Sequence, residues 1–301
     1  MSDDQRQVEL ERIGFGPFFE TQLARLEPGL VPARIAIAHG ESYVAWTATG
    51  AGKALILGRR LATWQTAADR PQVGDWVAGV HSTELQALLI EHRFERQTCL
   101  VRQPAADRPE LQVIAANVDV VGIVSALGDG NDPRRDLRLI NENQLRRYLG
   151  AVAHSRARPL LIVNKSDLSP DPTAVASALA GSFPDVPVVT LSGQQGVGME
   201  RLEPWLGRGQ TLVLVGMSGV GKSTLVNTLM GRAAQRVGAV RARDARGRHT
   251  TTHRELVVLP NGALLIDTPG MREMALWNEE DAGAASGDGR RGRRRQRHRG
   301  R

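Results

Sequence analysis

Two different hydrophobic patterns divide the chain. Between residues 34 and 102, short runs of aliphatic, β-branched and aromatic residues are separated by Gly and polar turns. Five of these runs predict strands, at 33–40, 42–49, 53–59, 74–80 and 87–94. Several short strands within roughly 70 residues are typical of a small closed barrel. We expect a five-stranded barrel of the oligonucleotide-binding (OB) type; the alternative is another small β domain with no binding role.

After Pro104 the spacing of the apolar positions changes. The run VDVVGIVSAL (118–127) is almost continuously apolar, which is typical of a strand buried on both faces. Residues 139–155 then show helical spacing, and strand-like and helix-like segments alternate from there to residue 270. This alternation predicts an α/β domain with a mostly parallel sheet.

The two ends of the chain carry weaker signals. Residues 1–30 predict at most a short helix before Pro28, and residues 279–301 are mostly Gly, Ala, Asp and Arg without periodicity, which predicts disorder. The expected organisation is therefore an N-terminal extension (1–30), a barrel (31–103), an α/β domain (104–278) and a tail (279–301).

Composition narrows the class of protein. Of the 301 residues, 41% are hydrophobic and 24% are charged, as in an ordinary soluble protein. No apolar run approaches the roughly 18 residues of a membrane span, and the polar, acidic start does not resemble a signal peptide. The single cysteine, Cys99, excludes a disulfide framework and a cysteine-rich zinc site, and we expect it to be a small buried apolar residue. These features predict a cytoplasmic protein without membrane contact.

The net charge of +7 comes from one segment. Eight of the 39 Lys and Arg residues lie at 290–301, so the rest of the chain has 31 basic against 32 acidic residues. The high charge is therefore no evidence for a basic folded surface.

A phosphate-binding loop is the most specific motif. GMSGVGKST (216–224) satisfies G-x-x-x-x-G-K-[ST] between a strand pattern and a helix pattern. Its glycines allow backbone N–H groups to close around phosphate oxygens, and the helix N-terminus adds a favourable dipole. Lys222 is expected to reach the β- and γ-phosphates, and the Ser223 hydroxyl to bind Mg²⁺. The predicted contact residues of this loop are Gly216, Met217, Ser218, Gly219, Val220, Gly221, Lys222, Ser223 and Thr224.

Two further motifs supply the rest of a guanine nucleotide site. In ALLIDTPG (263–270), Asp267 ends an apolar strand and can hold Mg²⁺, and the Gly270 N–H is suited to sensing a γ-phosphate. In NKSD (164–167), the Asp167 carboxylate can accept two hydrogen bonds from the Watson–Crick edge of guanine, a donor pair that adenine lacks.

Around that carboxylate, Asn164 can bond N7, the Lys165 stem can cover the ring, and Ser166 completes the loop. TLSGQQGVG (190–198) is the expected companion loop, in which Ser192 and a following backbone N–H, at Gly193, face guanine O6.

The order of these motifs is rotated. An ordinary GTPase has its phosphate loop first and its guanine loop late, whereas here the guanine loop, companion loop, phosphate loop and DTPG follow in that sequence. A sheet keeps its spatial strand order if the old chain ends are joined and new ends open elsewhere, and surface termini make such permutation tolerable. We therefore predict a circularly permuted P-loop GTPase domain preceded by a small OB-type β barrel.

The chain resembles the ribosome small subunit-dependent GTPase A (RsgA) family over roughly residues 31–278. The segments that carry the resemblance are QVIAANVDVVGIVSAL, GMSGVGKSTLVNTLMG, GRHTTTHREL and IDTPGMREMALW. The resemblance implies Mg²⁺-dependent hydrolysis of GTP to GDP and phosphate, stimulated by the small ribosomal subunit during its late maturation. It also implies contact of the barrel with ribosomal RNA (rRNA), and we expect a monomer. A non-catalytic, GTP-dependent RNA-binding switch is the alternative; a P-loop ATPase or kinase conflicts with NKSD.

Two catalytic expectations also follow from the resemblance. Met271 follows DTPG where many GTPases place a water-orienting Gln, and a Met side chain cannot polarise water. The resemblance makes His249 the candidate hydrolytic residue, with a solvated switch histidine as the alternative. One of Thr250, Thr251 and Thr252 is expected to bind Mg²⁺, with Thr251 or Thr252 preferred. The segment 236–252 is rich in Gly and Arg, as expected of a switch that orders on ligand binding.

The C-terminal part departs from the family pattern. The family continues into a helical module with a zinc site of three Cys and one His, but no cysteine follows Cys99 here. The zinc expected for the family therefore lacks its ligands in this sequence. The arginine-rich end is interpreted as a frame-shifted or truncated C-terminus, or alternatively as an RNA-binding tail.

Overall fold

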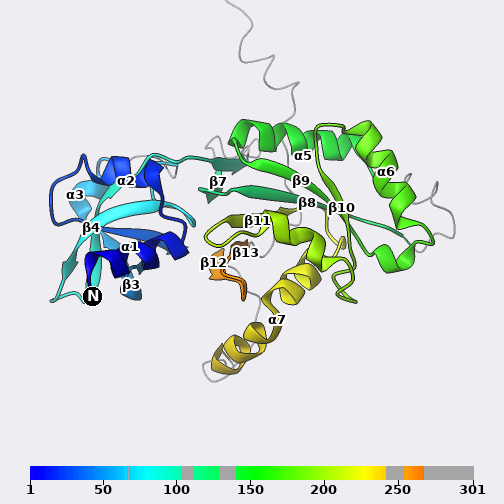
Figure 1. The fold of residues 1–301 in the computed structure, drawn as a ribbon. Helices are drawn as coiled ribbons and strands as arrows, with labels where there is room; N and C mark the ends of the chain where they lie inside the picture. The colour runs from blue at the N-terminus through cyan, green and yellow to red at the C-terminus, as the bar shows by residue number, and fades with distance from the viewer. Residues whose placement is uncertain (65, 67, 103–111, 129–139, 242–253, 268–301) are drawn as a thin grey trace, which may run out of the picture.

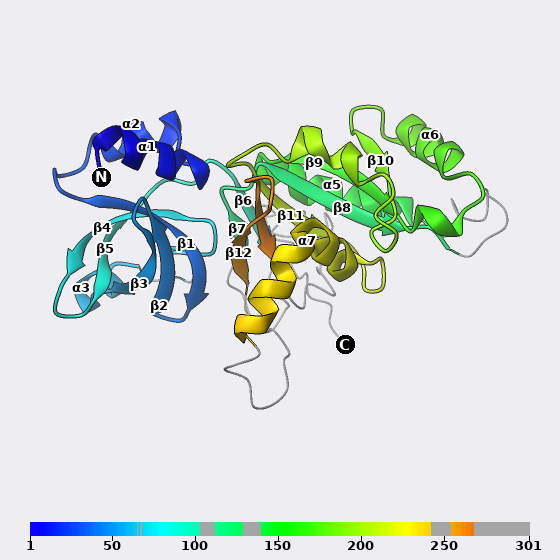
Figure 2. The same ribbon diagram turned by 60° about the horizontal axis from the view of Figure 1, so that its bottom comes forward.

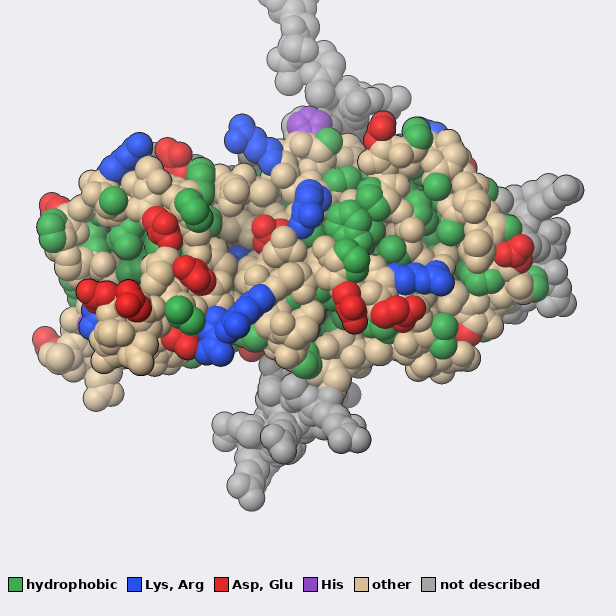
Figure 3. Space-filling view, in the orientation of Figure 1, with side chains coloured by type: hydrophobic (Ala, Val, Ile, Leu, Met, Phe, Trp, Pro, Cys, Tyr) green, Lys and Arg blue, Asp and Glu red, His purple; other side chains and the backbone are tan. Residues whose placement is uncertain are grey.

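A computed structural model describes residues 1–64, 66, 68–102, 112–128, 140–241 and 254–267 of the chain. These residues form a strand-rich domain and an α/β domain, which lie next to each other at the left and right of Figure 1. Acidic and basic side chains are interspersed on the face of both domains seen in Figure 3, in keeping with the balanced charge outside the tail.

The first domain is a closed five-stranded barrel. Each strand is paired on both sides, in the order β1-β2-β3-β5-β4 and back to β1, and only the β3–β5 pair is parallel. The strands are β1 (Val31–His39), β2 (Ser42–Thr47), β3 (Gly50–Ile56), β4 (Trp76–Ser82) and β5 (Ala87–Arg93), with a short helix α3 (Gly58–Leu61) between β3 and β4. Ile35, Tyr43 and Leu88 are among the side chains that fill its interior. All five predicted strands, and the OB-type barrel, are confirmed.

Residues 1–30 contain more structure than the single short helix predicted. Two helices, α1 (Asp3–Arg12) and α2 (Pro17–Leu23), pack against the barrel (Figure 2). Phe15 lies 4.8 Å, centroid to centroid, from the ring of Trp76, and Phe19 and Phe94 complete the buried aromatic cluster. These aromatic contacts explain why the segment is fixed on the barrel rather than extended from it.

The second domain is a sheet covered by helices on both faces. Its strand order is β10-β9-β8-β11-β13-β12, and every pair is parallel except β13–β12. The strands are β8 (Val120–Ala126), β9 (Arg158–Asn164), β10 (Val188–Thr190), β11 (Thr211–Val215), β12 (Glu255–Val258) and β13 (Leu264–Asp267). The helices are α5 (Glu142–Ser155), α6 (Pro172–Ser182) and α7 (Lys222–Arg241), and the 3-10 turns are η1 (Ser166–Leu168) and η2 (Met199–Trp205).

Local sequence explains where these helices begin. The Asn141 side chain accepts the N–H of Gln144 at the start of α5, and the Asp171 side chain accepts the N–H of Ala174 at the start of α6. Alternate residues of β8 then divide between two cores. Val121 packs with residues of α5 and α6, and Val120 packs with residues of η2 and α7. The continuous apolar runs in the sequence therefore reflect strands buried on both faces.

An antiparallel hairpin connects the domains. It consists of β6 (Cys99–Arg102) and β7 (Gln112–Ala116), and its Leu100 and Ile114 belong to the same core as α5. The hairpin thus packs with the α/β domain, and the last barrel strand ends at Arg93. We propose a domain boundary between β5 and β6, earlier than the predicted change at 103–104.

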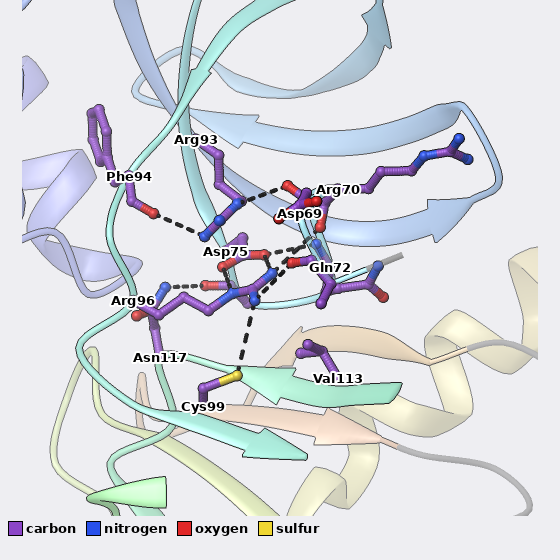
Figure 4. A network of polar contacts seen from close by, with 12 residues as sticks. Asp69, Arg70, Gln72, Asp75, Arg93, Phe94, Arg96, Cys99, Val113 and Asn117 are labelled. Atoms are coloured by element: carbon purple, nitrogen blue, oxygen red, sulfur yellow. Dashed lines mark hydrogen bonds and ion pairs between the residues drawn. The ribbon is translucent and has the colours of Figure 1, made fainter. Parts of the chain in front are cut away.

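A buried ion pair braces the end of the barrel next to this hairpin. Arg96 donates to both carboxylate oxygens of Asp75, from Nε at 2.8 Å and from Nη2 at 2.7 Å (Figure 4). The same guanidinium donates to the Ala68 carbonyl and lies 3.9 Å from the sulfur of Cys99. Cys99 is half-buried, and its burial raises the pKa of the thiol. It is thus less enclosed than the buried apolar residue that we expected.

Candidate nucleotide-binding site

The predicted nucleotide motifs meet at one edge of the sheet. Asn164 ends β9, the companion loop follows β10, the phosphate loop follows β11 and Asp267 ends β13. Because these strands are parallel, their carboxyl ends lie at the same edge. Open parallel sheets bind ligands at this edge.

The phosphate loop connects β11 directly to α7. Gly216, Gly219 and Gly221 all have positive φ angles, at 145°, 83° and 90°. A Cβ on Gly216 would lie 2.2 Å from the Val124 carbonyl oxygen of β8, so only glycine fits there. Nζ of Lys222 donates to the Gly216 and Met217 carbonyls, at 2.6 Å each, which folds its ammonium group over the loop.

The guanine loop contacts the phosphate loop through Asn164. This side chain is buried, and its Nδ2 donates to the Val220 carbonyl at 2.8 Å. Its Oδ1 accepts the Gly193 N–H at 2.9 Å. A Cβ on Gly221 would lie 2.4 Å from Asn164 Nδ2. One amide group therefore connects the three loops into a single site.

The rest of NKSD is arranged for access to a ligand. Lys165 has a left-handed backbone, with φ 60° and ψ 40°, and immediately precedes the 3-10 turn η1. The Ser166 N–H donates to the Leu191 carbonyl at 3.1 Å, which holds the turn beside the companion loop. Asp167 lies in this turn and is exposed. Its carboxylate is thus held on a fixed turn with its side chain open to solvent.

The companion loop is held by hydrogen bonds within itself and to Asn164. The Ser192 hydroxyl accepts the Gln195 N–H at 3.1 Å, and the Ser192 N–H donates to the Val197 carbonyl at 2.8 Å. Ser192 is fully buried, so it shapes the loop. The Gly193 N–H, expected to face guanine O6, donates here to Asn164. A guanine that binds this N–H would take it over from the Asn164 oxygen.

Several predicted residues lie outside the described residues. They are His249, Thr250, Thr251, Thr252, Gly270 and Met271. Of the metal-binding candidates that are described, Ser223 is exposed in the first turn of α7 and Asp267 is half-buried at the end of β13. Their strands are neighbours, because Val213 of β11 pairs with Ile266 of β13. The Ser223 hydroxyl and the Asp267 carboxylate thus follow from adjacent strands, and oxygen ligands of this kind suit a hard cation such as Mg²⁺.

One residue of this site was not singled out from the sequence. Thr228 of α7 donates a short hydrogen bond from Oγ1 to the Gly193 carbonyl of the companion loop. The only sequence signal is a hydroxyl residue two turns into the helix after the phosphate loop, which is a common and uninformative feature. The contact is visible only once α7 and β10 are folded together.

The strand order of the α/β domain agrees with a permuted GTPase. The strand before the phosphate loop, β11, lies in the middle of the sheet, between β8 and the strand ending in Asp267. The sequence model of the RsgA GTPase family matches residues 93–277. The chain belongs to the RsgA GTPase family. By this membership it is a GTP-hydrolysing enzyme, as predicted.

Individual relatives extend the RsgA match over most of the chain. The small ribosomal subunit biogenesis GTPase RsgA of Opitutus terrae is 39% identical over 287 residues, covering 92% of this chain and 76% of the relative. The protein of the same name from Syntrophotalea carbinolica is 39% identical, with 93% and 76% covered.

Two solved structures share the fold of this RsgA chain. The crystal structure of YjeQ from Thermotoga maritima aligns with a TM-score of 0.59 at 22% identity, covering 82% of this chain and 77% of that one. The structure of YloQ, a circularly permuted GTPase, aligns with a TM-score of 0.55 at 20% identity, covering 83% and 75%. The predicted fold class is therefore confirmed.

No group of three or more His, Cys, Asp or Glu side chains in the described residues is placed to hold a metal ion. Within the same described part of the chain, no helix has the length and apolar character needed to cross a membrane.

Proposed function

We propose that this GTPase acts in the biogenesis of the small ribosomal subunit, using a guanine nucleotide and Mg²⁺ at the carboxyl edge of its sheet. The observation that carries the nucleotide site is the double contact of Asn164 with Val220 and Gly193, because it joins the base-reading and phosphate-binding loops. The ribosomal assignment is supported by the names of the relatives and by the OB-type barrel, a fold that binds oligonucleotides.

Within this site we assign the base to the guanine loop. The Asp167 carboxylate accepts the N1–H and N2–H₂ edge of guanine, and the Lys165 stem covers the ring. The Asn164 amide has two hydrogens, and its bond to Val220 uses one, so the other can reach N7. Ser192 holds the companion loop against guanine O6, and Gly193 supplies the backbone N–H that donates to this oxygen.

The phosphates and the cation are assigned to the edge formed by β11 and β13. Lys222 turns from the loop carbonyls to the β- and γ-phosphates when nucleotide binds. Ser223 and Asp267 hold Mg²⁺, which neutralises charge developing on the phosphates, with Thr251 or Thr252 as a further ligand and Gly270 at the γ-phosphate. His249 is the proposed residue that activates the attacking water.

The proposed partners are the small subunit and its rRNA, together with GTP and GDP. We place this action in the cytoplasm, the compartment predicted from sequence, and the monomeric state stays a prediction. The alternative, a GTP-dependent RNA-binding switch, would bind the same partners without relying on hydrolysis.

Single-turnover hydrolysis of GTP, with and without purified small subunits, tests the proposal. We expect the subunits to raise the rate constant of hydrolysis, and large subunits at equal concentration serve as the control. Equal rate constants under all three conditions, together with no GTP-dependent binding to small subunits, would contradict the ribosomal assignment. Subunit binding that depends on GTP, combined with an unchanged hydrolysis rate, would favour the non-catalytic switch.

A further inference from the structure

The hydroxyl group of Thr228 has two acceptors on different parts of the site. Its Oγ1 is 3.0 Å from the Thr224 carbonyl one turn earlier in α7, and it makes its shorter contact with the Gly193 carbonyl. A bond to the carbonyl four residues earlier is common for Thr in any helix. The bond to Gly193 is different, because it crosses from the phosphate-loop helix to the companion loop.

This contact closes a ring of hydrogen bonds around the base-binding loops. The Asn164 side chain accepts a hydrogen bond from the Gly193 N–H and donates one to the Val220 carbonyl of the phosphate loop. Val220 precedes α7, and Thr228 of α7 returns to the Gly193 carbonyl. Both backbone groups of Gly193 are thereby held, one by the guanine loop and one by the helix.

Gly193 is buried beside Leu225 of α7, and the orientation of its peptide groups depends on such contacts. It has no side chain to restrict its backbone, and residues 194–197, which follow it, are exposed. The printed bonds of Ser192 to Gln195 and Val197 lie within the loop itself. They set the shape of the loop but do not attach it to the phosphate-loop helix.

The direction of the next peptide depends on the same contact. The Gly193 carbonyl and the Gln194 N–H belong to one planar trans peptide, so they point in opposite directions. When Thr228 draws the carbonyl toward α7, the Gln194 N–H turns away from the helix. Losing the hydroxyl would free this peptide to rotate.

We propose that Thr228 is a positioning residue for guanine recognition, holding the companion loop in its base-binding conformation and thereby slowing nucleotide dissociation. This rests on the proposed guanine site. A restrained loop is already ordered before the nucleotide binds, so binding costs less conformational entropy. Removing the restraint should raise the dissociation rate constant while leaving the phosphate chemistry intact.

The test compares three substitutions by stopped-flow fluorescence with a mant-labelled GDP and GTP. Thr228→Val keeps the branched shape but removes the donor, Thr228→Ser keeps the donor, and Thr21→Val is the matched control. Thr21 makes the equivalent bond to the Pro17 carbonyl in α2, 2.8 Å long, on the barrel side of the molecule. We expect Thr228→Val to raise the GDP dissociation rate constant about fivefold, as loss of one hydrogen bond implies. Thr228→Ser and Thr21→Val should stay within about twofold of the unsubstituted chain.

Two further readouts separate positioning from general damage. The effect of Thr228→Val should fall on the affinity for GTP more than on the single-turnover rate constant of bound GTP, because its Oγ1 contacts the companion loop. The preference for GTP over ATP should fall by the same factor as the GTP affinity. Equal dissociation rates in Thr228→Val and the unsubstituted chain would overturn the positioning role. Failure of the unsubstituted chain to bind guanine nucleotide would instead contradict the proposed function itself.

Discussion

Arg34 of the barrel donates a 2.8 Å hydrogen bond to the hydroxyl of Thr211, 177 residues later in the chain. Thr211 begins β11, the strand that leads into the phosphate loop. The same fully buried guanidinium donates to the Ile13 carbonyl at 2.6 Å and to the Asn117 carbonyl at 2.9 Å. Burial lowers the pKa of Arg34 to about 10, while Asp119 and Asp75 favour its charged form. One cation therefore joins the N-terminal helices, the barrel, the hairpin and the GTPase sheet.

Arg34→Met should reduce stability more than an ordinary surface substitution. It leaves the Ile13 and Asn117 carbonyls without this donor, and each buried acceptor left unsatisfied costs about 1–3 kcal/mol, so the two together cost about 2–6 kcal/mol. We expect the free energy of unfolding in urea to fall by that amount, with separate transitions for the two domains. The control is Arg59→Met. Arg59 pairs with Glu91 but is 69% exposed, so its loss should cost under about 1 kcal/mol. Equal losses in the two variants would refute the central role of Arg34.

Gly221→Ala should disrupt the nucleotide site more than Gly219→Ala. Both positions have positive φ angles, so alanine is strained at either. Only at Gly221 would the new Cβ collide with a neighbour, Asn164 Nδ2 at 2.4 Å, whereas Gly219 has open space around it. We expect Gly221→Ala to weaken GTP binding at least tenfold and Gly219→Ala to weaken it less, as measured by isothermal titration. Similar losses at both positions would show that backbone strain, rather than the Asn164 contact, controls the site.

The parts of the fold that could be predicted from sequence are those set by local patterns. Short and continuous apolar runs predict the strands. The order of the nucleotide motifs along the chain predicts the permutation and the grouping of NKSD with the phosphate loop. The two N-terminal helices were underestimated because they are held by Phe15 and Phe19 against Trp76, a contact with no local signature. Arg34 lies within the predicted strand 33–40 and carries no local signal of its role, because its partners at Ile13, Asn117 and Thr211 are brought together only in the folded chain. The same holds for Thr228.

Asp167→Asn should change the base preference of the enzyme. The exposed carboxylate in η1 is proposed to accept two hydrogen bonds from guanine, each worth about 1.5–3 kcal/mol because the acceptor is charged. Its loss should weaken GTP binding at least tenfold. The new amide offers a donor where xanthine offers an acceptor, so xanthosine triphosphate should bind the variant better than it binds the unsubstituted chain. Competition titrations measure both effects. Unchanged GTP affinity would contradict the guanine assignment.

Cys99 provides a pH-dependent probe of the domain junction. Burial raises the pKa of its thiol, and Arg96 only partly opposes this effect. At pH 8 the native chain should therefore react with iodoacetamide more slowly than the urea-unfolded chain. Because the folded pKa exceeds the unfolded one, stability from this group is complete below the unfolded pKa and declines as pH rises toward the folded pKa. Cys99→Ala should lack this decline between pH 8 and pH 10. Equal alkylation rates in the folded and unfolded chains would contradict the shift.

His249→Ala and Lys222→Ala should separate hydrolysis from binding. Lys222 folds over the phosphate loop through Gly216 and Met217, so its removal should weaken both GTP binding and turnover. His249 is proposed to act on the attacking water. Its removal therefore loses an interaction made only in the transition state and leaves GTP binding intact. We expect His249→Ala to lower subunit-stimulated turnover roughly 100-fold, the lower end of the range for general acid–base groups, with GTP affinity within about twofold of the unsubstituted chain.

The control for His249 is His253→Ala, four residues later in the same sequence segment. If His249 only adds charge to the segment, His249→Ala and His253→Ala should change the hydrolysis rate alike. If His249 activates the water, only His249→Ala should lower the rate. Single-turnover rate constants on small subunits and equilibrium titrations with a non-hydrolysable GTP analogue supply the two measurements. If His249→Ala hydrolyses GTP at the unsubstituted rate, the attacking water must be activated by another group, because Met271 carries no polar atom able to do so.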